Sequence, residues 1–252
     1  MAAVFLLKLN VQFPADPSAM EQIFLRWIHF VSGISWIGLL YFFNLVGFST
    51  MQELDAGTRG RVFPVLMSKA AWWFRWSAAV AWLMGFRYFM ILAQADATVA
   101  GEKGLMWKWI GIWFACWVIC FGALQGLLTA GTGAIKSSWV LAGLIAIVVI
   151  GACWVDLKFL AAPGAGNRTL SISLGGGLGT IMLFSVWGIV WRCQKRLIAW
   201  TKANVEQGTP MPAEAPKLTR LVFLTARMNF WLSFPMLFFM GASSHFPFLS
   251  GQ

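Results

Sequence analysis

The stretch FWLSFPMLFFMGASSHFPFL, residues Phe230–Leu249, is apolar almost throughout and contains one histidine, His245. Gly241 precedes this histidine by four residues, which is about one helical turn. The only other histidine of the chain, His29, lies in the first long apolar stretch, RWIHFVSGISWIGLLYFF, and Gly33 follows it by the same spacing. One histidine in the first apolar segment and one in the last form the strongest chemical signal in the sequence.

The composition is that of an integral membrane protein. Of the 252 residues, 59% are hydrophobic and only 11% are charged, whereas an average soluble domain has about 25% charged residues. Such a chain cannot cover a soluble surface with polar groups. The net charge of +10 is therefore interpreted as Lys and Arg gathered in loops on one side of a bilayer, and not as a nucleic-acid-binding surface.

A membrane-spanning helix needs about 20 mainly apolar residues, and the sequence has about six such segments. They predict an all-α bundle that forms a single transmembrane domain over residues 1–252. The expected spans are Ile23–Phe48, Ala70–Ala93, Leu105–Leu128, Ser138–Leu160, Leu174–Trp191 and Leu221–Phe248.

The loop charges predict the orientation of this bundle, because cytoplasmic loops carry an excess of Lys and Arg. The first, third and fifth loops contain Arg59, Arg61, Lys69, Lys136, Arg192, Lys195, Arg196, Lys202, Lys217 and Arg220. The opposite side has only Lys8, Lys103, Lys108, Lys158 and Arg168. We therefore expect these odd-numbered loops in the cytoplasm and both termini on the outer side of the membrane.

This topology brings the two histidines to the same membrane face. The first helix enters from the outer side, so His29 is expected about 9 Å below its start at 1.5 Å per residue. The last helix leaves on the same side, and His245 is expected in its final turn. Ionisable groups inside a membrane are costly, which makes this pair a functional hypothesis.

A haem b held by both imidazoles is the predicted occupant, because haem iron accepts axial histidine. Gly33 and Gly241 share a helix face with their respective histidines, so a flat macrocycle has room against bare backbone on both helices. Two alternatives remain open: hydrogen bonding and close packing of the two histidines at helix interfaces, or a metal other than haem. Two imidazoles without nearby Cys, Asp or Glu make a poor zinc or copper site.

Two arginines are candidates to hold the haem propionates, since an Arg fork suits a carboxylate. Arg26 precedes His29 by three residues, and Arg87 lies towards the outer end of the second span. For each of them, snorkelling to lipid headgroups is the competing interpretation.

Glycine runs predict close helix packing, both at Gly122 and Gly126 and at Gly175–Gly177 with Gly179. The sequence has no P-loop, no dinucleotide-binding fingerprint and no paired carboxylates within a span. It names no catalytic residue.

Three stretches resemble the urate oxidase N-terminal family, the membrane domain of bacterial urate hydroxylases. They are RWIHFVSGISWIGLLYFFNLV (Arg26–Val46), AAWWFRWSAAVAWLMGF (Ala70–Phe86) and ARMNFWLSFPMLFFMGASSHFP (Ala226–Pro247). The resemblance implies a polytopic redox protein of a bacterial inner membrane, coupled to cytochrome c, with both termini in the periplasm. It also places both histidines inside matched motifs. The sequence departs from the family pattern at Met228, where the family has histidine, and at RVFPVLMSK in the first loop, which lacks a histidine-bearing stretch.

Full-length members of the family carry a cytochrome c domain after the membrane domain, and this sequence stops where that domain would begin. We therefore expect electron transfer to or from a separate periplasmic cytochrome c, with urate as the substrate that the resemblance implies. The alternative is an accessory or structural subunit of a larger respiratory or oxidase complex in the membrane, with or without haem. The sequence leaves open whether the chain is an enzyme.

Overall fold

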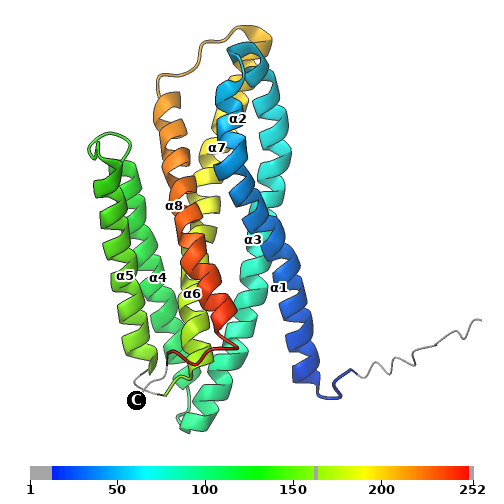
Figure 1. Cartoon of the computed structure of the whole chain (residues 1–252), viewed down its shortest axis with the longest axis vertical. Helices are drawn as coiled ribbons and strands as arrows, with labels where there is room; N and C mark the ends of the chain where they lie inside the picture. The colour runs from blue at the N-terminus through cyan, green and yellow to red at the C-terminus, as the bar shows by residue number, and fades with distance from the viewer. Residues whose placement is uncertain (1–12, 162–163, 250–252) are drawn as a thin grey trace, which may run out of the picture.

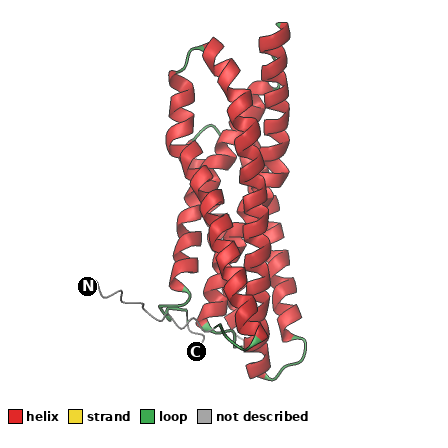
Figure 2. Cartoon of the chain, turned by 90° about the vertical axis from the view of Figure 1, so that its right-hand side faces the viewer, coloured by secondary structure: helices red, strands yellow, loops and turns green. Residues whose placement is uncertain are grey.

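The computed structural model describes residues 13–161 and 164–249, and every regular element in those ranges is helical (Figures 1 and 2). In chain order the elements are α1 (Pro17–Tyr41), η1 (Phe42–Gly47), α2 (Phe48–Glu53), α3 (Ala56–Ala100), α4 (Leu105–Ala130), α5 (Ser138–Ala161), α6 (Asn167–Ser185), η2 (Val186–Val190), α7 (Trp191–Gln207) and α8 (Ala215–Ala242). The elements η1 and η2 are π-helical segments that continue α1 and α6 without a break.

Six helical rods in the described ranges are long and apolar enough to cross a membrane. They are Pro17–Glu53, Ala56–Ala100, Leu105–Ala130, Ser138–Ala161, Asn167–Gln207 and Ala215–Ala242. The all-helical class and the predicted number of spans are confirmed for this part of the chain. Several rods extend beyond the expected spans: α3 is helical from Ala56, whereas the apolar segment begins only at Ala70.

Local sequence explains where the longest helices begin and end. The Asp16 side chain caps α1 by accepting the backbone N–H groups of Ser18 and Ala19, and Pro17 occupies the first helical position. Asp55 caps α3 in the same way through the N–H of Thr58. At the other end of α3, Gly101 has a φ of 72°, the left-handed conformation that ends many helices.

The helix α6 forms the centre of the bundle and is buried along nearly its whole length. Its glycines make that possible: a Cβ on Gly177 would lie 1.8 Å from a ring atom of Trp117 in α4, so a side chain has no room there. The predicted packing role is confirmed for this glycine. By contrast, a Cβ on Gly122 or Gly126 would meet no described atom within 4 Å, so these two glycines face outward.

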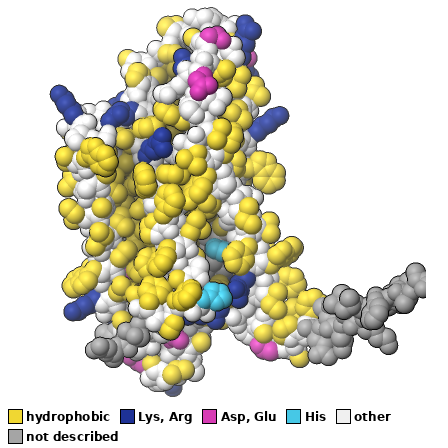
Figure 3. Space-filling view, in the orientation of Figure 1, with side chains coloured by type: hydrophobic (Ala, Val, Ile, Leu, Met, Phe, Trp, Pro, Cys, Tyr) yellow, Lys and Arg dark blue, Asp and Glu magenta, His cyan; other side chains and the backbone are white. Residues whose placement is uncertain are grey.

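The outside of the bundle is apolar. Hydrophobic side chains cover most of the face seen in Figure 3, and on α5 Trp139 is 89% exposed and Ile147 is 68% exposed. A soluble monomer rarely exposes so much contiguous apolar surface. Contact with the lipid bilayer accounts for it, as expected for a multi-pass membrane protein.

The start of α1 and the end of α8 lie at the same end of the bundle, the lower end in Figure 1. We call this the terminal end and the opposite one the loop end. The end of α3 and the start of α4, and the end of α5 and the start of α6, also lie at the terminal end, as the alternating direction of the six rods requires.

Candidate functional site

A cavity of about 650 Å³ opens between the rods near the terminal end. Its walls come from α1, α3, α6 and α8, with Trp113 contributed by α4, and both His29 and His245 line it. The volume lies within the range of about 300–1,000 Å³ that is typical of small-molecule and cofactor sites. The two histidine side chains are visible on the face shown in Figure 3, close to this opening.

His29 is held by the neighbouring helix α3. Its Nδ1 lies 2.7 Å from the carbonyl oxygen of Ala81. A carbonyl oxygen only accepts, so Nδ1 carries the proton and Nε2 keeps its lone pair. Metal-ligating histidines usually have this arrangement, in which the ring N–H remote from the metal is donated to a backbone carbonyl or a carboxylate.

Gly85 leaves the space that the His29 ring occupies. A Cβ at this position would lie 2.8 Å from Cε1 and 3.0 Å from Nδ1 of His29, closer than real carbon contacts allow. The imidazole therefore packs directly on the backbone of α3, one turn beyond Ala81. Sequence reasoning missed Gly85, although a glycine inside the apolar segment AWLMGF was a visible signal.

His245 lies outside the helix that leads to it. The helix α8 ends at Ala242, and His245 follows in a turn in which its backbone N–H bonds to the carbonyl of Ala242 at 3.1 Å. The expectation that His245 belongs to the final helical turn is therefore wrong. Two serines, Ser243 and Ser244, separate the helix end from the histidine, and the His245 side chain is exposed at the cavity mouth.

The glycines predicted beside the histidines form open parts of the cavity wall. Gly33 on α1 and Gly241 on α8 both line the cavity. A Cβ added to either of them would meet no described atom within 4 Å. Bare backbone at these positions leaves the adjoining space free for a bound group.

The two predicted arginines differ in position. Arg26 lines the cavity and has no ion-pair partner among the described residues. Arg87 does not line it; its Nε and one of its terminal nitrogens donate to the Glu21 carboxylate, at 2.7 and 3.0 Å. This pair ties α1 to α3 at an exposed position, so only Arg26 is placed to meet a ligand carboxylate in the cavity.

An aromatic wall faces α1 across the cavity. The rings of Trp82 and Phe86 on α3 stack with centroids 5.0 Å apart, and Phe86 stacks in turn on Trp113 at 5.8 Å. The indole N–H of Trp82 donates to Thr180 at 2.7 Å, and that of Trp113 donates to the Ser173 carbonyl at 2.9 Å. These bonds fix the wall to α6. No spacing pattern distinguishes these rings from the rest of the 16 tryptophans, so the wall was not predicted.

The cavity closes where α1 and α8 meet. The hydroxyl groups of Tyr41 and Ser233 hydrogen-bond at 3.0 Å, and the Tyr41 ring packs edge-on against Phe230 at 5.3 Å. Both residues lie about one turn beyond the last lining residues, Gly38 and Met236. The first and last helices are therefore in contact towards the loop end and are separated by the cavity towards the terminal end.

These features fit a haem. A porphyrin supplies four nitrogen ligands itself, so the protein has to add only axial ligands, and two imidazoles line one cavity with a free Nε2 on His29. A site built by the protein alone needs three or four ligands. Within the described ranges, no group of three His, Cys, Asp or Glu side chains is placed to hold a metal ion.

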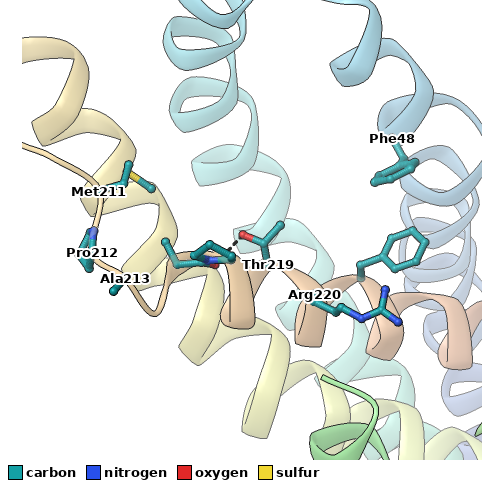
Figure 4. A pocket seen from close by; sticks show the side chains of 9 residues that line it. Phe48, Met211, Pro212, Ala213, Thr219 and Arg220 are labelled. Atoms are coloured by element: carbon teal, nitrogen blue, oxygen red, sulfur yellow. Dashed lines mark hydrogen bonds between the residues drawn. The ribbon is translucent and has the colours of Figure 1, made fainter. Parts of the chain in front are cut away.

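A second hollow, of about 760 Å³, lies at the loop end (Figure 4). Phe48 of α2 lines one side, and residues 211–213 and the first turns of α8 line the rest, including Thr219 and Arg220. Its lining contains no His, Cys, Asp or Glu, and Met211 is its one side chain of a metal-ligating type. The cavity near the terminal end is therefore the candidate site.

The comparisons with known proteins agree with the resemblance found in the sequence. Residues 56–252 match the family described as urate oxidase N-terminal. This range includes His245, Gly241 and the aromatic wall, whereas His29, Arg26 and Gly33 precede it. Neither the curated proteins nor the solved structures gave a match.

Proposed function

The chain belongs to the urate oxidase N-terminal family, and we propose that it is a membrane haem b protein that passes electrons to a periplasmic cytochrome c. The observation that carries the proposal is the convergence of the only two histidines on one cavity. The hydrogen bond from His29 to the Ala81 carbonyl supports it, because it places the proton on Nδ1 and leaves Nε2 with a lone pair for a ligand bond.

In this proposal the residues of the cavity bind and orient the cofactor. His29 and His245 would hold the haem iron through their imidazoles, Gly33 and Gly241 would leave room for the ring, and Arg26 would pair with a propionate. When bound there, haem b supplies a one-electron carrier whose potential depends on its axial ligands and surroundings. The apolar and aromatic walls keep water away from the buried side of the cavity.

Urate is the proposed electron donor, on the basis of the family. Hydroxylation of urate by water releases two electrons and two protons, and the electrons leave one at a time through a one-electron carrier. With both histidines bound to its iron, a haem here would carry electrons and would not bind oxygen. The loop charges favour the periplasmic side for the histidine end, where c-type cytochromes accept electrons.

The test of this function is anaerobic reduction of the purified, haem-loaded protein. Urate is expected to reduce the haem, and added oxidised cytochrome c is expected to reoxidise it. Allantoin, a related ring compound, serves as the negative control and should leave the spectrum unchanged. If urate never reduces the haem, but cytochrome c reoxidises haem that has been reduced chemically with dithionite, urate is excluded as the donor and the electron-transfer role is kept. A haem that neither one touches would overturn the proposal.

A further inference from the structure

We propose that Asn167 is the positioning residue that holds His245 at the cavity, an inference that rests on the proposed function for its meaning. His245 belongs to a segment without helical structure, residues 243–249, which we call the strap. The ring of His245 has no hydrogen-bond partner among the described residues, so its placement depends on how the strap is fixed.

Every hydrogen bond that the Asn167 side-chain amide makes in the structure goes to the strap. Its Nδ2 donates to the carbonyls of Ser243 and Phe246, at 3.4 and 3.2 Å, and its Oδ1 accepts the N–H of Leu249 at 2.8 Å. These contacts bracket His245 on both sides. Among the side chains, only an amide combines two donors with an acceptor in this way.

Asn167 is itself anchored to α3, the helix that hydrogen-bonds the His29 ring. It is the first residue of α6, and the preceding Gly166 donates its N–H to the Asp96 carboxylate of α3 at 2.8 Å. Helix α3 also provides Ala81, the hydrogen-bond partner of His29. Both histidines are therefore positioned relative to α3: His29 directly, and His245 through α6 and Asn167. The helices α1 and α8 themselves are separated by the cavity at this level.

The expected consequence concerns the His245 side of the iron alone. Without Asn167 the strap loses three hydrogen bonds, His245 leaves its axial position more readily, and an external ligand can bind there. His29 keeps its support from Ala81 and Gly85, so the haem itself stays bound.

The experiment compares Asn167→Ala and Asn167→Asp with Asn204→Ala. Asn204 is a matched control, because its side chain also donates to a backbone carbonyl, that of Thr209 at 2.8 Å, but at the loop end. Hydrogen exchange of the strap amides, measured by mass spectrometry, is expected to accelerate about tenfold in Asn167→Ala, the effect of losing roughly one net hydrogen bond. Asn167→Asp keeps the acceptor for Leu249 but sets a carboxylate oxygen against the carbonyls of Ser243 and Phe246, so it should not restore slow exchange.

Binding of carbon monoxide to the reduced haem tests whether Asn167 positions His245 as a ligand and does not only stabilise the strap. The wild type and Asn204→Ala should bind little of it, and Asn167→Ala should bind at least about tenfold more at the same pressure. Unchanged exchange in Asn167→Ala would overturn the inference, as would faster exchange without any gain in carbon monoxide binding. If the wild type carries no haem, the proposed function fails, and the exchange result alone decides whether Asn167 holds the strap.

Discussion

His29 and His245 reach the same cavity on different kinds of support. His29 lies in the middle of the 25-residue helix α1, with its ring bonded to Ala81 and packed on the backbone of Gly85. His245 lies beyond the end of α8, exposed, on a strap that Asn167 holds through polar contacts. The first is placed by helix packing and the second by a few hydrogen bonds. The difference predicts one firm and one releasable ligand in a site that looks symmetric in sequence.

The largest effect is expected from removing the histidines one at a time. His29→Ala should abolish haem binding, because the rest of the site has no other firmly held ligand. His245→Ala should keep part of the haem in a form that binds carbon monoxide. The ratio of haem to protein after purification measures the difference, with circular dichroism to show that both variants are folded. Equal and complete loss in both would refute the asymmetry.

Gly85→Ala disturbs the packing of His29 without removing a ligand. The added methyl carbon would lie 2.8 Å from Cε1 of the His29 ring and would therefore collide with it. We expect haem affinity to fall about 10- to 100-fold, as it does when a metal-binding histidine loses the groups that orient it. Titration of the apoprotein with haemin measures this. Gly111→Ala, at a position with open space around it, is the matched control, and wild-type affinity in Gly85→Ala would contradict the role assigned to the backbone contact.

Gly33→Ala and Gly241→Ala test whether the open walls face a bound group. Neither methyl group would touch the described protein, and alanine favours a helix over glycine by up to about 1 kcal/mol. The folding stability of the apoprotein should therefore stay equal or rise, while haem affinity falls several-fold. Gly122→Ala, which faces away from the cavity, should show only the gain in stability. Unchanged haem affinity in the two cavity variants would mean that the ring does not lie against these walls.

The smallest effect is expected from Tyr41→Phe, which alters the contact between α1 and α8 beyond the cavity. It removes the hydrogen bond to Ser233, worth about 1 kcal/mol or less. Ser233 retains its bond to the Phe230 carbonyl at 2.6 Å, so no buried hydroxyl is left without a partner. Thermal unfolding should shift slightly, with the visible spectrum unchanged. A spectral change would show that this contact sets the geometry of the ligands.

Much of the fold follows from hydropathy, because the need to bury about 20 apolar residues in lipid dominates every other signal. The boundaries of the rods do not. Helix α3 starts at Ala56 and includes Arg59 and Arg61, and the rod of α6 and α7 continues to Gln207. Helices extend past the apolar region wherever caps and charged turns stabilise them in water, and hydropathy does not register that part.

Only those features of the site that depend on residue spacing within one segment could be predicted from the sequence. His29, His245 and their glycines stand out within single segments, and the structure brings them to one cavity with Arg26. Three other contributions depend on how helices that are distant in sequence lie against one another. They are the backbone of Gly85, the carbonyl of Ala81 and the hydrogen bonds of Asn167 to the strap. The pairing of Arg87 with Glu21 also depends on how α1 lies on α3 and could not be seen in the sequence. This is why the sequence made Arg87 a candidate for the haem propionates.

The most direct test of the central claim is a reduced-minus-oxidised visible spectrum of the protein purified from haem-sufficient cells. A b-type haem signal is predicted, with electron paramagnetic resonance of the oxidised form showing low-spin iron with two imidazole ligands. That signal should be lost in His29→Ala and altered in His245→Ala. A folded but colourless wild type would contradict the account, as would a haem whose spectrum is the same in both variants.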